Sequence, residues 1–167
     1  EYPLIDIFYL LVTLTFIRVM KKVSKKGLGQ GLFANLRYLP DSRQPNPDFS
    51  LNDAARRGAS ILLSGRNFGC GSSREHAVWA LRGAGVACVI ADSFARIFFR
   101  NAVNNGFPVV ELEEITVEIE NGDELEVNLR EGILKNNTKG KELSFTPLPD
   151  FAFKIADAGG LLQSIKK

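Results

Sequence analysis

The chain has 167 residues, of which 45% are hydrophobic and 24% charged, as is usual for a globular domain. Its 21 basic and 19 acidic residues leave a net charge of only +2, which argues against a nucleic-acid or membrane partner. Two cysteines, Cys70 and Cys88, are too few for a disulfide framework or for an iron–sulfur cluster, which is normally held by about four thiolates. With a single histidine, a zinc site is poorly supported too. We therefore expect no cofactor or metal on this chain, and a reducing, cytoplasmic setting.

The first 22 residues are dominated by one apolar run, which extends from Ile7 to Ile17. A membrane-spanning helix needs about 20 such residues, and this run is much shorter. A signal peptide places positive charge before its apolar stretch, whereas here Asp6 precedes the run and Arg18 follows it. We interpret the run as a buried strand or an aggregation-prone arm, and we expect no membrane segment.

Residues 23–58 are rich in Gly, Pro, Asn and Asp and show no sustained periodicity. This pattern predicts a long loop with one short helix near its end, and loops of this length in compact domains are often lids or binding loops. A disordered linker is the alternative. Three aromatic residues, Phe33, Tyr38 and Phe49, favour packing over disorder.

Strands and helices alternate from position 59 to position 112. Short apolar runs, typical of buried parallel strands, are separated by amphipathic segments. This alternation predicts a parallel sheet with right-handed crossovers. The expected elements are strands at 60–64, 86–91 and 108–112, a helix at 73–83, and a second helix that Ser93 caps. The expected buried faces carry Ala77, Ala80, Leu81 and Ala84 on the first helix and Phe94, Ile97, Phe98 and Ala102 on the second.

After position 112 the pattern becomes that of an antiparallel segment. Two stretches of alternating apolar and polar residues flank Asn121-Gly122-Asp123, which predicts a β-hairpin. The chain is thus expected to form one α/β domain over residues 1–167, a parallel sheet core with an appended β segment and a C-terminal helix at 113–167. The remaining expected elements are hairpin strands at 116–120 and 124–129, a strand at 141–146, and a final helix that Asp150 caps and Gly159-Gly160 end.

The segment with the most chemical information is Gly65–His76, GRNFGCGSSREH, where a parallel strand ends and a helix begins. Open α/β sheets bind ligands at such places, and the backbone N–H groups of a helix start favour anions. Gly69 and Gly71 allow a tight turn and close approach of the backbone to a ligand. The guanidinium of Arg74 suits a carboxylate.

Simpler interpretations of the same segment stay open. Ser72 and Glu75 have the spacing of a capping box, which is a common structural feature. Gly69-x-Gly71 also resembles the start of a dinucleotide fingerprint with Asp92 as the ribose acid, although Arg74 stands where that fingerprint needs its third glycine. For His76, packing within the helix is as plausible as a positioning role. We expect Cys70 to be a small side chain packed in a tight turn. We expect Cys88, which lies in the apolar run VACVIA, to belong to the core.

The sequence GRNFGCGSSREHAVWAL resembles the swivelling domain of the aconitase superfamily, and the form with Cys70 resembles the small subunits of the isopropylmalate dehydratase family. Three further phrases fit the same family: QPNPDF at 44–49, SFARIFFRN at 93–101 and AGGLLQSIKK at 158–167. The resemblance extends from about Val23 to the C-terminus. It implies a three-layer α/β fold of the swivelling-domain type.

The resemblance also implies a reaction and a partner. In this family a separate large subunit, joined in a heterodimer or heterotetramer, holds a 4Fe–4S cluster whose open iron acts as a Lewis acid. The pair isomerises 2-isopropylmalate to 3-isopropylmalate by dehydration and rehydration in leucine biosynthesis. By motif match Ser72 is the catalytic base and Arg74 binds a substrate carboxylate. The other residues expected to line the substrate site are Gly71, Ser73 and His76 from the motif and, for the alkyl group, Leu28, Leu32 and Leu36 from the long loop.

Other functions remain possible from the sequence. Homoaconitase small subunits and related 2-alkylmalate hydro-lyases share the motif, and a non-catalytic anion- or nucleotide-binding module is the alternative from a different class. Residues 1–22 depart from the family, because they lack its Asp-Thr-Asp segment followed by Ile-Ile-Pro. The sequence therefore predicts a first strand that differs from that of the family.

Overall fold

The computed structural model describes residues 29, 32–33, 37–49, 52, 59–71, 75–120 and 122–165. The predicted N-terminal strand or arm at 7–17 lies outside these residues, as does most of the predicted loop at 23–58. In the part of that loop that is described, Phe33 and Phe49 are buried and meet edge to face, with ring centroids 6.0 Å apart. The prediction that these aromatic residues pack is therefore confirmed.

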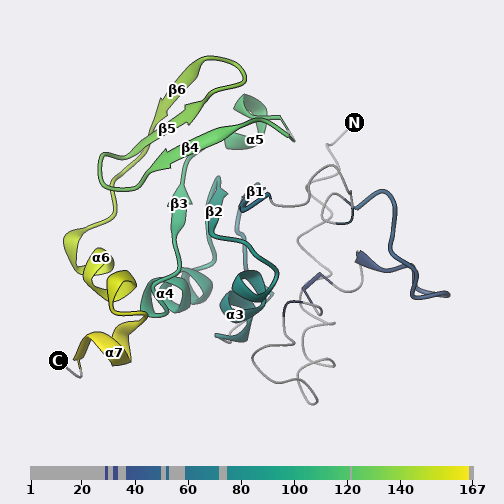
Figure 1. Ribbon diagram of the computed structural model, residues 1–167, viewed down its shortest axis with the longest axis horizontal. Helices are drawn as coiled ribbons and strands as arrows, with labels where there is room; N and C mark the ends of the chain where they lie inside the picture. The colour runs from purple at the N-terminus through teal and green to yellow at the C-terminus, as the bar shows by residue number, and fades with distance from the viewer. Residues whose placement is uncertain are drawn as a thin grey trace.

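Three parallel strands form the centre of the domain (Figure 1). They are β1 (Ile61–Ser64), β2 (Cys88–Ala91) and β3 (Val109–Glu111), in the order β1-β2-β3, and α3 (His76–Gly83) and α4 (Arg96–Asn104) connect them. All four residues of β2 are buried, as the continuous apolar run predicts for a central parallel strand. The predicted strand, helix, strand, helix, strand order is confirmed.

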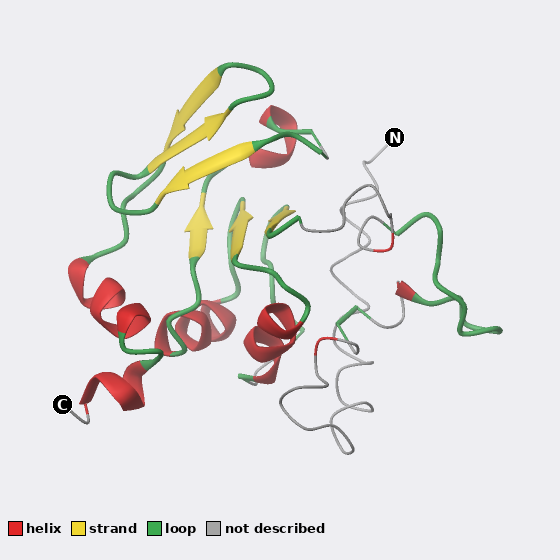
Figure 2. Ribbon diagram, viewed as in Figure 1, coloured by secondary structure: helices red, strands yellow, loops and turns green. Residues whose placement is uncertain are grey.

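Side chains on the two faces of this sheet enter two different hydrophobic clusters. Val89 and Ala91 of β2 pack with α3 and α4, whereas Cys88 and Ile90 point to the opposite face. Burial raises the pKa of the Cys88 thiol to about 12, so this side chain is inert core, as expected. The helices thus cover one face of the parallel sheet (Figure 2).

A second, antiparallel sheet adds to the other cluster. It consists of β4 (Leu125–Asn128), β5 (Ile133–Asn136) and β6 (Lys141–Ser144), in that order. Leu134 of β5, which is fully buried, and Phe145 beyond β6 pack with Ile90 of the parallel sheet. The molecule is therefore a three-layer α/β domain with an appended β segment, as predicted.

The hairpin prediction for 116–120 and 124–129 is wrong in its first strand. Residues Ile115–Glu118 form the short helix α5 instead. Ile115 and Ile119 are both buried, a spacing of one helical turn, and the carboxylate of Asp92 accepts the backbone N–H of Ile115 at 3.1 Å. The hairpin forms later, between β4 and β5, where Gly132 adopts φ of +70°.

Several details of the predicted helices also need correction. Ile97 is 53% exposed and Ala84 lies exposed at the C-cap of α3, so neither belongs to a buried face. Asp150 is the first residue of α6 (Asp150–Asp157), and the N-cap is Pro149. The negative charge of Asp150 still suits the positive end of the helix dipole. The glycines at 159 and 160 end α6 as predicted, but a further helix, α7 (Leu161–Ile165), follows them.

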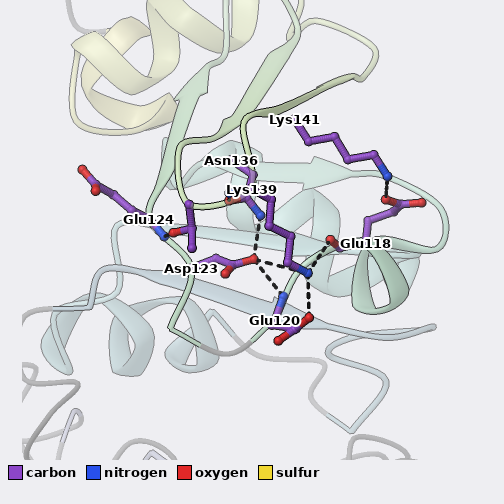
Figure 3. Close-up of polar contacts among 8 residues, drawn as sticks. Glu118, Glu120, Asp123, Glu124, Asn136, Lys139 and Lys141 are labelled. Carbon is purple, nitrogen blue, oxygen red and sulfur yellow. Dashed lines mark hydrogen bonds and ion pairs between the residues drawn. The ribbon is translucent and has the colours of Figure 1, made fainter.

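Figure 3 shows a polar cluster that fixes the segment between α5 and β4. The Asp123 side chain is only 7% exposed, and its Oδ2 accepts the backbone N–H of Glu120 at 3.0 Å and the side-chain amide of Asn136 at 2.6 Å. Lys139 donates to the carboxylate of Glu120 at 2.8 Å, and Lys141 pairs with Glu118. These contacts tie the start of β4 to the turn that links β5 to β6.

The cluster predicts a contribution to stability that is lost in acid. The hydrogen bonds from the Glu120 N–H and the Asn136 amide hold the pKa of Asp123 below its ordinary value. A carboxyl group with a lowered folded-state pKa stabilises the fold above its unfolded pKa, near 4, and this contribution disappears as pH falls through the folded pKa. Asp123→Asn should therefore lower the free energy of unfolding at neutral pH, and the deficit relative to wild type should shrink below about pH 4.

Urea unfolding of both proteins across a pH series measures this difference. Glu120→Gln is the matched control, because the Glu120 side chain is 79% exposed and its ion pair with Lys139 is open to solvent. We expect a much smaller pH-dependent difference for the control. A deficit in Asp123→Asn that stays constant down to acidic pH would contradict the assignment.

Candidate active site

The loop after β1 is held against the segment that follows β2, at the carboxyl edge of the parallel sheet. The backbone N–H of Phe68 donates to the Ser93 carbonyl oxygen at 2.9 Å, and the N–H of Ala95 donates to the Phe68 carbonyl oxygen at 2.9 Å. Phe68 and Phe94 thereby form one parallel bridge beyond the ends of the regular strands. The loop is an extension of the sheet at the edge where ligands bind in this class of fold.

Side chains fix the turn that follows. Asn67 has a φ of +58°, and its backbone N–H donates to Ser93 Oγ at 2.8 Å. Ser93 therefore does not cap its own helix as predicted; Ala95 is the N-cap of α4, without a side-chain cap. The Ser93 hydroxyl instead joins the loop after β1 to the loop after β2. The sequence pattern does not reveal this contact.

Gly69 is the point of closest approach between this loop and α4. Its φ is +82°, and a Cβ at this position would lie 2.3 Å from Cγ of Phe98. The Phe98 ring, only 1% exposed, meets the Phe68 ring edge to face at 5.1 Å. The prediction that this glycine permits a tight turn is confirmed, and the group it approaches is a phenylalanine ring of the protein itself.

The structure describes three of the eight predicted site residues. Gly71 lies half-buried at the end of the loop that follows β1, residues 65–71, which we call the pinned loop. His76 is the first residue of α3. Leu32 is 2% exposed and packs in the cluster between the helices and the sheet, so its predicted contact with substrate stays a prediction. The other predicted residues, Ser72, Ser73, Arg74, Leu28 and Leu36, lie outside the described residues.

The start of α3 lies directly after the motif. Glu75 is the N-cap residue, and its carbonyl oxygen accepts the N–H groups of Val78 and Trp79. Glu75 makes no side-chain capping bond from this position, and the Ser72 half of the predicted capping box falls outside the described residues. The His76 ring packs edge-on against Trp79, with centroids 4.9 Å apart, and its Nδ1 is buried.

Two other expectations for this edge change with the structure. Cys70 is exposed rather than packed, although its N–H donates to the Asn67 carbonyl oxygen at 3.2 Å. The Asp92 carboxylate accepts the backbone N–H of Ile115 from α5 at 3.1 Å, so it has a structural partner within the protein. Asp92 and Glu111, which accepts the Phe94 N–H at 3.3 Å, are residues of this edge that motif reasoning missed or misassigned.

Neither a metal centre nor a membrane helix is evident in the described part of the chain. No group of three His, Cys, Asp or Glu side chains lies close enough to hold a metal ion within those residues. None of the helices among them has the length and hydropathy to cross a bilayer.

Comparison with known proteins identifies the family. The model of the aconitase C-terminal domain matches residues 13–115, which include the pinned loop and the whole parallel sheet. The chain belongs to the aconitase C-terminal domain family. The match ends where α5 begins, so the antiparallel sheet and the last two helices lie beyond the part that the family model covers.

Relatives within the aconitase C-terminal domain family carry consistent names. The 3-isopropylmalate dehydratase small subunit of Caldicellulosiruptor bescii is 59% identical over 106 residues, which are 64% of this chain and 64% of that protein. The small subunit of the same name from Methanosarcina mazei is 54% identical over 121 residues, 72% of each chain. The chain thus spans less than two thirds of the first of these relatives.

A solved structure extends the likeness beyond the family model. The crystal structure of 3-isopropylmalate dehydratase from Methanocaldococcus jannaschii superposes with a TM-score of 0.66 at 31% sequence identity. The superposition covers 88% of this chain and 80% of that chain, so it includes part of the region after position 115. The likeness to this solved structure therefore extends further along the chain than the family match, which ends at residue 115.

Proposed function

We propose that this chain is the small subunit of a heteromeric hydro-lyase that isomerises 2-isopropylmalate to 3-isopropylmalate in the leucine pathway of the cytoplasm. The observation that carries the proposal is the pinned loop, which ends at Gly71 directly before Ser72 and Arg74 at the carboxyl edge of the sheet. Relatives up to 59% identical are named as small subunits of this enzyme. A large subunit is the proposed partner.

In the proposed reaction this chain supplies the base and one carboxylate contact. Ser72 takes a proton from the carbon beside a substrate carboxylate, and Arg74 binds that carboxylate with its planar guanidinium. A serine alkoxide is unstable at neutral pH, and helix N–H groups with a nearby arginine lower that cost when water is excluded. Docking of the partner provides the exclusion.

The 4Fe–4S cluster is assigned to the partner. Cys88 is buried with a pKa of about 12, and within the described residues no three His, Cys, Asp or Glu side chains lie together. When bound to the large subunit, the cluster supplies a Lewis-acidic iron for the substrate hydroxyl and carboxylate. The work left to this chain is to hold the substrate and to move the proton.

The alkyl group of the substrate has to be recognised elsewhere than at the motif, whose polar groups suit features that all 2-alkylmalates share. We assign this contact to Leu28 and Leu36 of the long loop; Leu32 is 2% exposed and packs in the core cluster, so its contact with substrate stays a prediction. A protein named isopropylmalate/citramalate isomerase small subunit, from Methanocaldococcus jannaschii, is 55% identical over 107 residues. An apolar pocket discriminates such substrates only weakly, by about 1–3 kcal/mol per methylene. A related 2-alkylmalate hydro-lyase, homoaconitase included, is therefore the second candidate.

Reconstitution tests the proposed function. The isolated chain should show no dehydration of 2-isopropylmalate, because it lacks the Lewis-acidic iron of the reaction. Addition of the large subunit under anaerobic conditions should produce activity that saturates when the two chains are equimolar. Measuring 2-isopropylmalate, citramalate and homocitrate in parallel separates the two candidates. Turnover by the isolated chain, or none with a large subunit that is active with another small subunit, would refute the proposal.

A further inference from the structure

Two buried polar atoms between α3 and α4 lack the hydrogen bonds that buried groups normally have. They are Nδ1 of His76 on α3 and Nδ2 of Asn101 on α4, and within the described residues no other buried side-chain nitrogen or oxygen is in this condition. Unpaired buried polar atoms are costly and rare in folded proteins. Two of them on neighbouring helices point to a shared role.

One hydrogen bond between α3 and α4 relates the positions of His76 and Asn101 along the two helices. α3 and α4 run in the same direction, because each follows a strand of the parallel sheet. Their register is fixed by the bond from Trp79 Nε1 to Asn105 Oδ1, at 2.9 Å. His76 precedes Trp79 by about one helical turn, and Asn101 precedes Asn105 by about one turn. His76 and Asn101 therefore each lie about one helical turn before a residue of this bond.

The chemistry of the two atoms is complementary. An amide nitrogen can only donate, and a neutral imidazole can accept at Nδ1 only when its proton is on Nε2. We propose that Asn101 holds His76 in the Nε2–H form, by donating to Nδ1 directly after a side-chain rotation or through one bridging water. The edge-on contact with Trp79 fixes the plane of the ring. His76 is then a fixed N–H donor at the start of α3 and not a proton acceptor.

This assignment rests on the proposed function for its meaning in catalysis. With Ser72 as the base, a second base four residues further along the chain would compete for the proton. A neutral imidazole locked as a donor avoids that competition, and it orients an acceptor, a carboxylate or the serine oxygen, instead. His76 is accordingly a positioning residue.

The tautomer can be read directly, because His76 is the one histidine of the chain. In tag-free protein labelled with ¹⁵N-histidine, at a pH where the imidazole is neutral, NMR should show a protonated Nε2 and a bare Nδ1. Asn101→Asp, whose carboxylate can only accept, should move the proton to Nδ1, and Asn101→Leu should give a mixture. Asn104→Leu, at an exposed position of the same helix, is the control and should change nothing. A wild-type proton on Nδ1, or an unchanged tautomer in Asn101→Asp, would overturn the proposal.

Activity of the reconstituted complex tests the positioning role separately. His76→Gln keeps an N–H donor but cannot act as a base, so it should retain most of kcat. His76→Leu removes the donor and should lower kcat about tenfold, the effect of one hydrogen bond. An equal loss of roughly 10²-fold or more in both variants would identify His76 as a base and refute the donor role. An inactive wild-type complex would count against the proposed function only, since the NMR result does not depend on turnover.

Discussion

Replacing Ser72 with alanine should reduce kcat of the reconstituted complex by roughly 10²-fold or more, while substrate binding changes little. The reason is that the hydroxyl is the proposed proton acceptor, and alanine has no group to take its place. If Ser72 has only a structural, capping role before α3, the same substitution should instead cost about 1 kcal/mol in the free energy of unfolding and leave kcat unchanged. Steady-state kinetics and urea unfolding on one preparation distinguish these results.

A matched serine variant controls for general effects on assembly. Ser144→Ala lies at the exposed end of β6, far along the chain from the motif, and should behave as wild type in both measurements. Normal turnover by Ser72→Ala in a complex whose subunit affinity is also normal would remove Ser72 from the proposed mechanism. The motif would then be a structural capping element.

Gly69→Ala should be the most destabilising single methyl addition in the site. The backbone at Gly69 has a φ of +82°, which costs an L-residue about 1–2 kcal/mol. The new Cβ would also lie 2.3 Å from the Phe98 ring, whose own burial at 1% exposure leaves it little room to move. Overpacking of this kind adds about 1–3 kcal/mol. We expect a total loss of roughly 2–5 kcal/mol in the free energy of unfolding.

Gly85→Ala isolates the steric part of that effect. Gly85 has a similar φ, +89°, but a Cβ there would meet no atom within 4 Å. Its alanine variant should therefore lose only the backbone contribution, about 1–2 kcal/mol. Equal losses in the two variants, measured by urea unfolding, would show that the loop relaxes away from Phe98 and is not held as tightly as its hydrogen bonds indicate.

Elements that depend on local pattern were predictable from the sequence. The three parallel strands are short apolar runs, and each of the first two is followed by a segment of helical periodicity, so their order and direction follow from patterning and from the handedness of the crossovers. The motif from Gly65 to His76 likewise predicted a turn and a helix start. Its position at the carboxyl edge of β1 required only the topology.

Elements whose interaction partners are distant in the chain were not predictable from the sequence. Residues 116–120 have a strand pattern, but most of this segment lies in α5. The reason is that Asp92 accepts the Ile115 N–H and that two isoleucines one turn apart are buried. The hydroxyl of Ser93 binds the Asn67 N–H rather than its own helix. In both cases a local preference is outweighed by one hydrogen bond to a residue more than twenty positions away.

The same division holds for the candidate site. By itself the sequence indicated the family, which the comparisons confirm, and it predicted which residues carry the chemistry, because a serine, an arginine and closely spaced glycines at a strand-to-helix junction are fixed by their spacing along the chain. Only the tertiary structure decided how the junction is held: a bridge to the next strand, a hydroxyl contact, and a glycine against Phe98. It also decided that Leu32 packs in the core and that Nδ1 of His76 and Nδ2 of Asn101 are buried without a hydrogen-bond partner. Such contacts join groups far apart in the chain, and packing between layers selects them after local preference has formed each element.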